Sequence, residues 1–209
     1  MPLPLQFRLD PAPSILFPRA MDIPAPLRQL PNQLTVARIA AIPVLCLFIG
    51  MGNGWLRWLA LLIYVAAAVT DWLDGFLARR MNMQSDLGKM LDPIADKLLV
   101  GCLLVTFAWT RDFSGLDLVP AIAILFREIF VAGLREFMGN RSVSVPVTFL
   151  AKWKTTVQLV ALFFVIVDGL LPGFGLISSL LLWIAGALTV WTGWQYLVSM
   201  WPYFSAKTE

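Results

Sequence analysis

Long runs of apolar residues alternate with short groups of charged and turn-forming residues along most of the chain. The runs are of the length that an α-helix needs to cross a bilayer, about 20 residues for a hydrocarbon core about 30 Å thick. The pattern therefore predicts an all-α fold, a polytopic membrane protein with six transmembrane helices. They are predicted at residues 33–51, 56–79, 88–110, 117–138, 149–168 and 175–200.

Charged residues gather at one end of several of these runs. The fully uncharged parts of three runs, residues 59–70, 98–110 and 155–167, reach spanning length only when the charged residues at one end are included. If the chain crosses the membrane six times, those ends face one common side. Basic residues on that side outnumber Arg57 and Arg111 on the other, so the positive-inside rule makes it cytoplasmic, with both termini inside. These charged residues are then expected to form a polar cavity that faces the cytoplasm, where any active site would lie.

The first 31 residues differ from the rest, because they hold eight of the fourteen prolines. Proline at this density prevents a continuous helix. No apolar stretch of about 7 to 15 residues leads to a small-residue cleavage site, so no signal peptide is expected. The chain thus divides into a proline-rich cytoplasmic or interfacial tail, residues 1–31, and a six-helix domain, residues 32–204.

Composition narrows the chemistry that the chain can perform. Hydrophobic residues make up 59% of the 209 residues, compared with about 45 to 50% in soluble domains. There is no histidine, which leaves carboxylates as the obvious acid, base and metal-binding groups. Cys46 and Cys102 lie in apolar runs and are expected to be buried and unpaired. The net charge of +3 favours anionic surfaces and substrates as neighbours.

Four aspartates stand among the apolar runs: Asp71, Asp74, Asp92 and Asp96. A charged side chain at the centre of a bilayer costs roughly 2.5 to 3.5 kcal/mol on insertion scales, so each carboxylate needs water, a cation or a proton. Asp71 and Asp74 lie about 60° apart around one helix, and Asp92 and Asp96 about 40° apart around the next. The two pairs are therefore spaced to close on hard divalent cations.

Two structural explanations of the same residues stay open. Asp92 and Pro93 have the order of a helix N-cap and a first helical residue, and Asp96 would then simply favour the helix dipole. Alternatively, the first pair of aspartates forms ion pairs with Arg79 and Arg80 that hold helices together.

The spacing of these residues resembles a family signature. From Asp71 to Asp96 the sequence reads D-x-x-D-G-x-x-A-R-x8-G-x3-D-x3-D, which is similar to the signature of the CDP-alcohol phosphotransferases. Eight fixed positions within 26 residues make chance agreement negligible.

Within this family the chain resembles one branch, the bacterial phosphatidylglycerophosphate synthases, from about residue 30 to 202. Ala151 departs from that branch, which usually has glycine at this position. The stretches that carry the resemblance are Leu30 to Arg38, Asp92 to Lys97, Arg127-Glu128, Gly133 to Glu136 and Lys152 to Gln158.

The resemblance implies a transferase that uses two Mg²⁺ or Mn²⁺ ions. Four aspartates bring a charge of about −4, two divalent ions return +4, and such a pair of ions suits displacement at phosphorus. The implied metal ligands are Asp71, Asp74, Asp92 and Asp96. Asp96 is also the implied general base. The implied CDP-binding residues are Asn32, Thr35, Asp71, Asp74, Gly75, Ala78, Arg79 and Gly88.

The implied substrates are CDP-diacylglycerol and glycerol 3-phosphate, whose phosphate needs cationic partners of its own. Candidates for that role are Arg38, Arg127, Arg135, Arg141 and Lys152. Two of these arginines are followed by Glu128 and Glu136. Because adjacent residues do not face one another on a helix, it stays open whether they bind substrate or form ion pairs, such as Glu128 with Arg135.

Other functions also stay open. The same chemistry with another acceptor, namely inositol phosphate, serine or phosphatidylglycerol, is the first alternative. The second is an ion-coupled membrane transporter, in which intramembrane aspartates bind ions near the midplane. The expected location is the inner membrane of a bacterium, as a homodimer in the lipid bilayer, with no nucleic-acid polymer as a partner.

Overall fold

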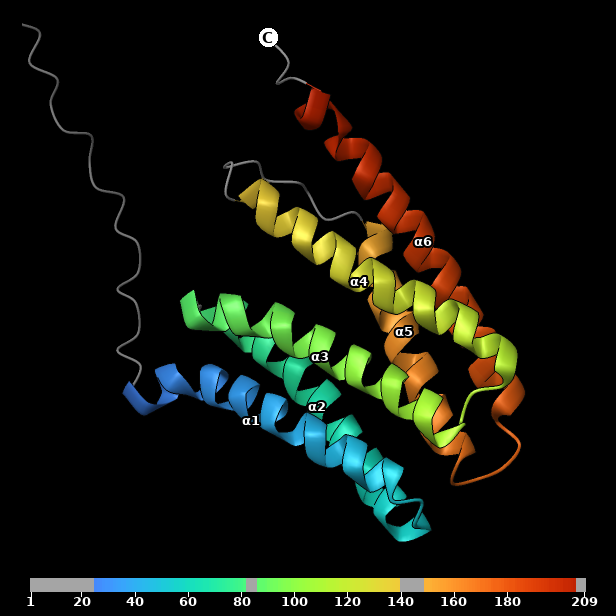
Figure 1. Ribbon diagram of the computed structural model, residues 1–209. Coiled ribbons are helices and arrows are strands. Elements are labelled where there is room, and N and C mark those ends of the chain that lie inside the picture. The colour runs from blue at the N-terminus through green and yellow to red at the C-terminus, as the bar shows by residue number, and fades with distance from the viewer. Residues whose placement is uncertain (1–24, 82–85, 140–148, 206–209) are drawn as a thin grey trace, which may run out of the picture.

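The structure is a computed structural model, and it describes residues 25–81, 86–139 and 149–205 (Figure 1). Within these ranges the regular secondary structure consists of six α-helices and one short 3-10 helix. The prediction of an all-α fold is therefore confirmed for the part of the chain that is described. The elements are α1 (Ala25–Gly50), α2 (Gly54–Met81), α3 (Asp86–Thr110), η1 (Gly115–Asp117), α4 (Leu118–Gly139), α5 (Phe149–Asp168) and α6 (Gly175–Ser205).

Each predicted span corresponds to one of these helices, because the apolar runs end where the chain turns. The turn after α1 contains Gly52 and the turn after α5 contains Gly173, with φ of 68° and 127°. Both values favour glycine, which has no Cβ to clash in this region. These turns explain why the boundaries of α2 and α5 were predictable to within a few residues.

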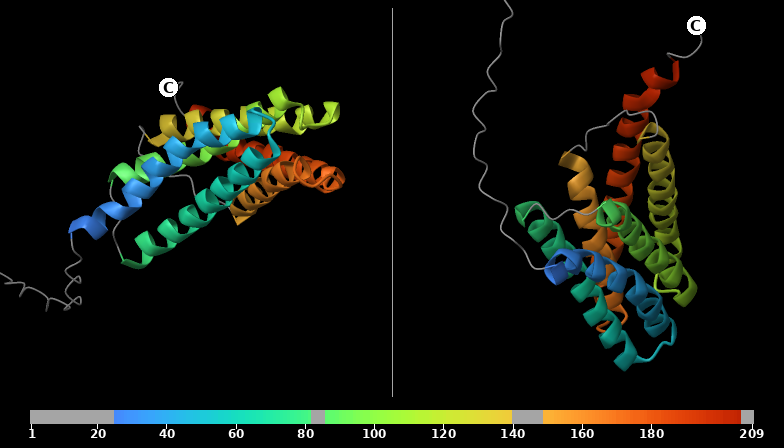
Figure 2. Two further views of the ribbon diagram at one scale, coloured as in Figure 1. Left: turned by 90° about the horizontal axis from the view of Figure 1, so that it is seen from below. Right: turned by 90° about the vertical axis from the view of Figure 1, so that its left-hand side faces the viewer.

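The helices run back and forth, so the turns that end α1, α3 and α5 lie at the same end of the bundle (Figure 1). We call this the hairpin end, and the opposite end, where α2 ends and α3 begins, the aspartate end. Helix α1 packs mainly on α2 and α3, and α6 on α4 and α5. Seen from below, α2 and α5 lie on one face of the bundle and α1, α3 and α4 on the other (Figure 2).

Apolar side chains both fill the interior and cover the outside. Leu103, Phe107 and Ile124 are fully buried in the core, whereas Leu62 and Phe126 are large apolar side chains that face outward. An apolar exterior of this kind suits lipid rather than water. Among the described residues, three stretches are long and apolar enough to cross a membrane, which indicates an integral membrane protein. They are Asn32–Gly50 in α1, Gly54–Leu73 in α2 and Gly175–Trp201 in α6.

Helix α1 begins earlier than the predicted first span. It starts at Ala25 and passes through Pro31, although residues up to 31 were predicted to form a tail without continuous helix. Pro26 stands at the second residue of the helix, where a missing backbone N–H removes no intrahelical bond. The rest of the predicted tail, residues 1–24, lies outside the described residues.

Helix α3 also begins earlier than the interpretation of Asp92 as a helix N-cap required. It starts at Asp86, and Pro93 lies inside it. The interpretation of Asp92 as an N-cap was therefore wrong, because Asp92 is already a full turn and more into the helix. Its carboxylate is not used to cap backbone N–H groups and is available for other contacts.

The hairpin end is held by a buried ion pair between α2 and the turn that follows α3. Arg57 Nη2 lies 2.8 Å from Asp112 Oδ1, and both side chains are largely buried. Arg57 Nε also donates to the carbonyl oxygen of Ile166 in α5, at 3.4 Å. This pair connects three helical hairpins at the end of the bundle remote from the aspartates.

Candidate active site

Arg38 of α1 pairs with the first aspartate of the motif. Its Nη1 donates a hydrogen bond to Asp71 Oδ1 of α2. The Arg38 side chain is only 2% exposed, whereas that of Asp71 is 41% exposed. The buried guanidinium therefore fixes one oxygen of a carboxylate that stays open to ligands on its exposed side.

Thr35 makes the equivalent contact with α3. Its Oγ1 donates to Asp92 Oδ1 at 2.8 Å, from a side chain that is almost completely buried. Thr35 and Arg38 are three residues apart and so lie on the same face of α1. One face of α1 thus orients one aspartate on each of the two helices against which it packs.

Asp96 belongs to the same neighbourhood. It lies one turn after Asp92 on α3, and its carboxylate interacts electrostatically with Asp71, Arg38 and Asp92. Three of the four predicted metal ligands therefore lie in one neighbourhood, on two helices. Arg38 offsets only part of their combined negative charge.

The donor set fits a hard divalent cation, because every donor from these aspartates is a carboxylate oxygen. Asp74 lies within α2, three residues after Asp71, but its side chain is outside the description. Among the side chains that are described, no group of three or more His, Cys, Asp or Glu residues is close enough to hold an ion. The proposed coordination by all four aspartates stays a prediction.

The predicted CDP-binding residues lie on the same three helices. Asn32 and Thr35 are on α1, and Gly88 is in the first turn of α3. Gly75, Ala78 and Arg79 lie on the last turns of α2, and their side chains are not described. All of these residues are thus at the aspartate end of the bundle, and their contacts with a nucleotide stay a prediction.

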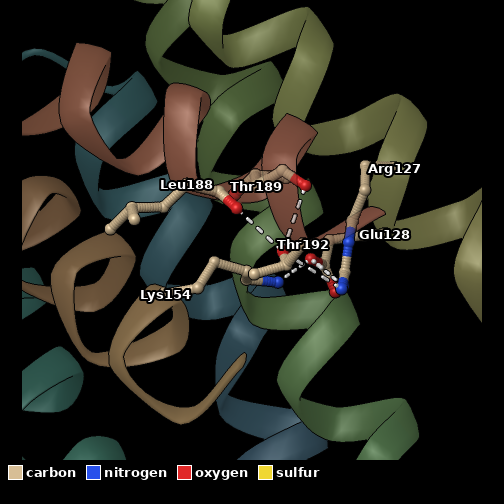
Figure 3. A network of polar contacts seen from close by, with 6 residues as sticks. All are labelled: Arg127, Glu128, Lys154, Leu188, Thr189 and Thr192. Carbon is tan, nitrogen blue, oxygen red and sulfur yellow. Dashed lines mark hydrogen bonds and ion pairs between the residues drawn. The ribbon is translucent and has the colours of Figure 1, made fainter. Parts of the chain in front are cut away.

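A second charged cluster joins α4, α5 and α6 (Figure 3). Glu128 Oε1 accepts from Lys154 Nζ of α5 and from Arg127 Nη1, the latter at 3.3 Å. Arg127 Nη2 reaches Thr192 Oγ1 of α6 at 3.5 Å. The side chains of Arg127, Glu128 and Lys154 are 11%, 15% and 4% exposed. We call these four residues the charged cluster.

The charged cluster corrects one expectation from the sequence. Arg127 and Glu128 were expected not to face one another because they are adjacent, yet they form an ion pair. Two long side chains can bend toward each other even when their Cα atoms point in different directions. Arg135, suggested as a partner of Glu128, instead has its guanidinium 5.2 Å from the centre of the Tyr196 ring.

Comparison with known proteins identifies the family. The sequence profile of the CDP-alcohol phosphatidyltransferases matches residues 28–191, which include all four aspartates and the charged cluster apart from Thr192. The chain belongs to the CDP-alcohol phosphatidyltransferase family. The resemblance inferred from the motif is thereby confirmed, and the chain is an enzyme of this family rather than a transporter.

Relatives within the family carry two kinds of name. A protein of Rickettsia bellii is 44% identical over 178 residues, covering 84% of this chain and 97% of the relative. One of Cereibacter sphaeroides is 37% identical and covers 83% and 96%. Both are named CDP-diacylglycerol–glycerol-3-phosphate 3-phosphatidyltransferase. A cardiolipin synthase (CMP-forming) of Oryza sativa is 38% identical, covering 85% of this chain and 59% of the relative.

Lys154 is a residue of this CDP-alcohol phosphatidyltransferase that was missing from the predicted set of cations. Lys152 was predicted in its place to bind the acceptor's phosphate, but its side chain is not described. Arg141, predicted for the same role, lies outside the described residues. The sequence did contain a signal for Lys154. It shares a helical face with Gln158, Ala161 and Val165, all of which are buried. A lysine on the buried face of an apolar helix needs an anionic partner.

Proposed function

We propose that this protein transfers a phosphatidyl group from CDP-diacylglycerol to sn-glycerol 3-phosphate, giving phosphatidylglycerophosphate and CMP. The observation that carries the proposal is that Asp71, Asp92 and Asp96 lie near one another at one end of the bundle, where Arg38 orients Asp71 and Thr35 orients Asp92. The acceptor is chosen because relatives named for it align over 96% and 97% of their own length.

Transfer requires an acceptor hydroxyl, a phosphorus atom and a base in close proximity. In the proposed reaction a hydroxyl oxygen of glycerol 3-phosphate forms a bond to the β-phosphorus of CDP-diacylglycerol. The bond from that phosphorus to the oxygen shared with the α-phosphorus breaks, and CMP leaves. Asp96 takes the hydroxyl proton, since it is the carboxylate one turn after Asp92 and stands near Asp71 and Asp92.

Two Mg²⁺ or Mn²⁺ ions held by Asp71, Asp74, Asp92 and Asp96 would stabilise the negative charge that develops on the phosphoryl oxygens. The residues of the chain prepare this site. Arg38 and Thr35 fix the orientation of Asp71 and Asp92 by their hydrogen bonds. The carboxylate oxygens are then already oriented before the substrate binds, which reduces the rearrangement of side chains needed during the reaction.

The nucleotide is proposed to lie along the last turns of α2. Gly75 and Ala78 carry little or no side chain, so a diphosphate can approach the helix backbone there, and Arg79 can neutralise phosphate oxygens. Asn32, Thr35 and Gly88 are proposed to complete the site from α1 and α3. The acceptor's phosphate is proposed to bind Arg127 and Arg135 together with Lys154. Arg38, Arg141 and Lys152 are the remaining candidates.

The membrane arrangement follows from the same proposal. All six helices are proposed to span the bilayer, with the aspartate end in a cavity that faces the cytoplasm and both termini on that side. The tail, residues 1–31, and the six-helix domain, residues 32–204, are the proposed division of the chain. A bacterial inner membrane and a homodimer are the proposed location and assembly.

An acceptor panel tests the function. Purified protein in detergent or vesicles would be given CDP-diacylglycerol and each acceptor in turn, and CMP release would be measured. We expect release with glycerol 3-phosphate and little with inositol phosphate or serine. Phosphatidylglycerol is the second candidate acceptor, because the chain is also similar to a cardiolipin synthase. Faster CMP release with phosphatidylglycerol than with glycerol 3-phosphate would assign the chain to that activity instead.

A further inference from the structure

The charged cluster contains more positive than negative charge. Glu128 is the carboxylate that contacts Arg127 and Lys154. Arg135 also acts electrostatically on both of these cations, although its guanidinium lies over Tyr196. Two largely buried cations therefore contact one carboxylate, and the exposed Arg135 adds a third positive charge nearby. Buried charges need partners, so this surplus of positive charge favours an anion.

Polar atoms around the cluster have spare hydrogen-bonding capacity. Three buried atoms make no hydrogen bond to the described part of the protein: Arg127 Nε, Gln158 Nε2 and Thr189 Oγ1. Gln158 lies one turn after Lys154 on α5, and Thr189 one turn before Thr192 on α6. Such buried donors are costly unless a ligand or another partner uses them.

The cluster lies at the depth of the aspartates. Lys154 stands fourteen residues before the end of α5, and Asp96 fourteen residues before the end of α3. At about 1.5 Å per residue, each lies about 21 Å along its helix from the hairpin end. Both helices end there (Figure 1), and α3 contacts α4 and α5 directly. An acceptor with its hydroxyl at Asp96 and its phosphate at the cluster would therefore lie at one depth in the bundle.

We propose that Glu128 is a positioning residue that holds Lys154 and Arg127 side by side, so that both cations bind the phosphate of the acceptor. The proposal rests on the function proposed above and assigns a role to a residue that does not itself touch the substrate. Lysine has a long flexible stem and needs such a tether, and α5 is connected to α4 in the cluster by this ion pair. Gly193 of α6 leaves room for the stem of Arg127, since a Cβ there would lie 2.9 Å from Arg127 Cγ.

Kinetics of Glu128→Gln and Glu128→Asp test this role. We expect Glu128→Gln to raise KM for glycerol 3-phosphate about tenfold or more, because charge-assisted contacts of two cations are lost, with KM for CDP-diacylglycerol little changed. Glu128→Asp keeps the charge and should recover most of the loss. Asp112→Asn is the matched control. It breaks the buried Arg57 ion pair at the hairpin end, so it should lower the melting temperature and leave both KM values unchanged.

A double variant separates positioning from mere stability. In Glu128→Gln with Lys154→Met both partners of that ion pair are uncharged and only Arg127 loses a partner, so the melting temperature should recover in part, while KM for glycerol 3-phosphate stays raised because one phosphate-binding cation is gone. Recovery of that KM together with the melting temperature would overturn the proposal, as would equal increases in both KM values in Glu128→Gln. Wild-type protein is assayed first. If it releases CMP only with another acceptor, the proposed function fails, and the same variants tested with that acceptor still decide the role of Glu128.

Discussion

At the scale of single residues, the site depends on two side chains of α1 that lie one helical turn apart. Thr35 and Arg38 are both buried, and each binds one oxygen of an aspartate on a neighbouring helix. Neither residue belongs to the aspartate motif itself. Their contribution is to fix the direction of Asp71 and Asp92, on which any bound cation depends.

Thr35→Val tests the orientation of Asp92. Valine has the shape of threonine but cannot donate the 2.8 Å hydrogen bond, so kcat/KM should fall about tenfold or more, as expected for loss of a bond to a charged group. Thr106→Val is the control, because Thr106 is also buried but its hydroxyl donates to a carbonyl within α3. Equal losses in the two variants would show that the effect is one of packing and not of carboxylate orientation.

Replacing the aspartates one at a time separates metal binding from proton transfer. Asp71→Asn and Asp92→Asn should lose Mg²⁺ or Mn²⁺ binding and activity together. Asp96→Asn should retain more metal binding while losing the chemical step, since a base is needed only for proton transfer. Metal titration and CMP release on each variant decide this. Near-normal turnover in Asp96→Asn would remove the assignment of Asp96 as the base.

At the scale of helices, α4 and α6 are in close contact at one point. A Cβ built on Gly186 of α6 would lie 2.7 Å from Pro120 Cβ and 3.2 Å from Pro120 Cα of α4. Both values are shorter than ordinary contacts between carbon atoms. The two backbones approach here because Gly186 has no side chain, as is common where membrane helices pack tightly.

Gly186→Ala should therefore force α4 and α6 apart and destabilise the protein by about 1 to 3 kcal/mol. Gly133→Ala is a matched control on α4, since a Cβ at that position meets nothing within 4 Å. The control should be neutral or slightly stabilising, because alanine favours helix more than glycine. Thermal unfolding in the same detergent compares the two variants. Equal melting temperatures for both would show that the α4–α6 contact is not tight.

The helices themselves could be predicted from the sequence because apolar runs and turn glycines mark them directly. The start of α1 could not, since Pro26 is compatible with the first turn of a helix. The start of α3 was predicted to within two residues, although Pro93 also allowed the wrong interpretation of Asp92 as an N-cap. The aspartate motif was also readable, because its spacing is local. The contacts of Thr35 with Asp92 and of Glu128 with Lys154 join residues on different helices, and no local spacing reveals them.

At the scale of the whole molecule, two groups of charges lie within one largely apolar bundle. The aspartates lie between α1, α2 and α3 and carry surplus negative charge, whereas the charged cluster lies between α4, α5 and α6 and carries surplus positive charge. This separation suits the proposed reaction, in which a phosphatidyl group leaves a diphosphate that needs divalent cations and passes to an acceptor that carries a phosphate. Membership of the CDP-alcohol phosphatidyltransferase family agrees with that division of roles.

The most direct test of this account follows the atoms of the acceptor. Protein would be incubated with CDP-diacylglycerol, Mg²⁺ and labelled glycerol 3-phosphate, and label in the lipid phase would be compared with the CMP released. The account predicts equal amounts of both, with the label in phosphatidylglycerophosphate. CMP release without label in the lipid phase would contradict it, because the phosphatidyl group would then have gone to water or to a different acceptor.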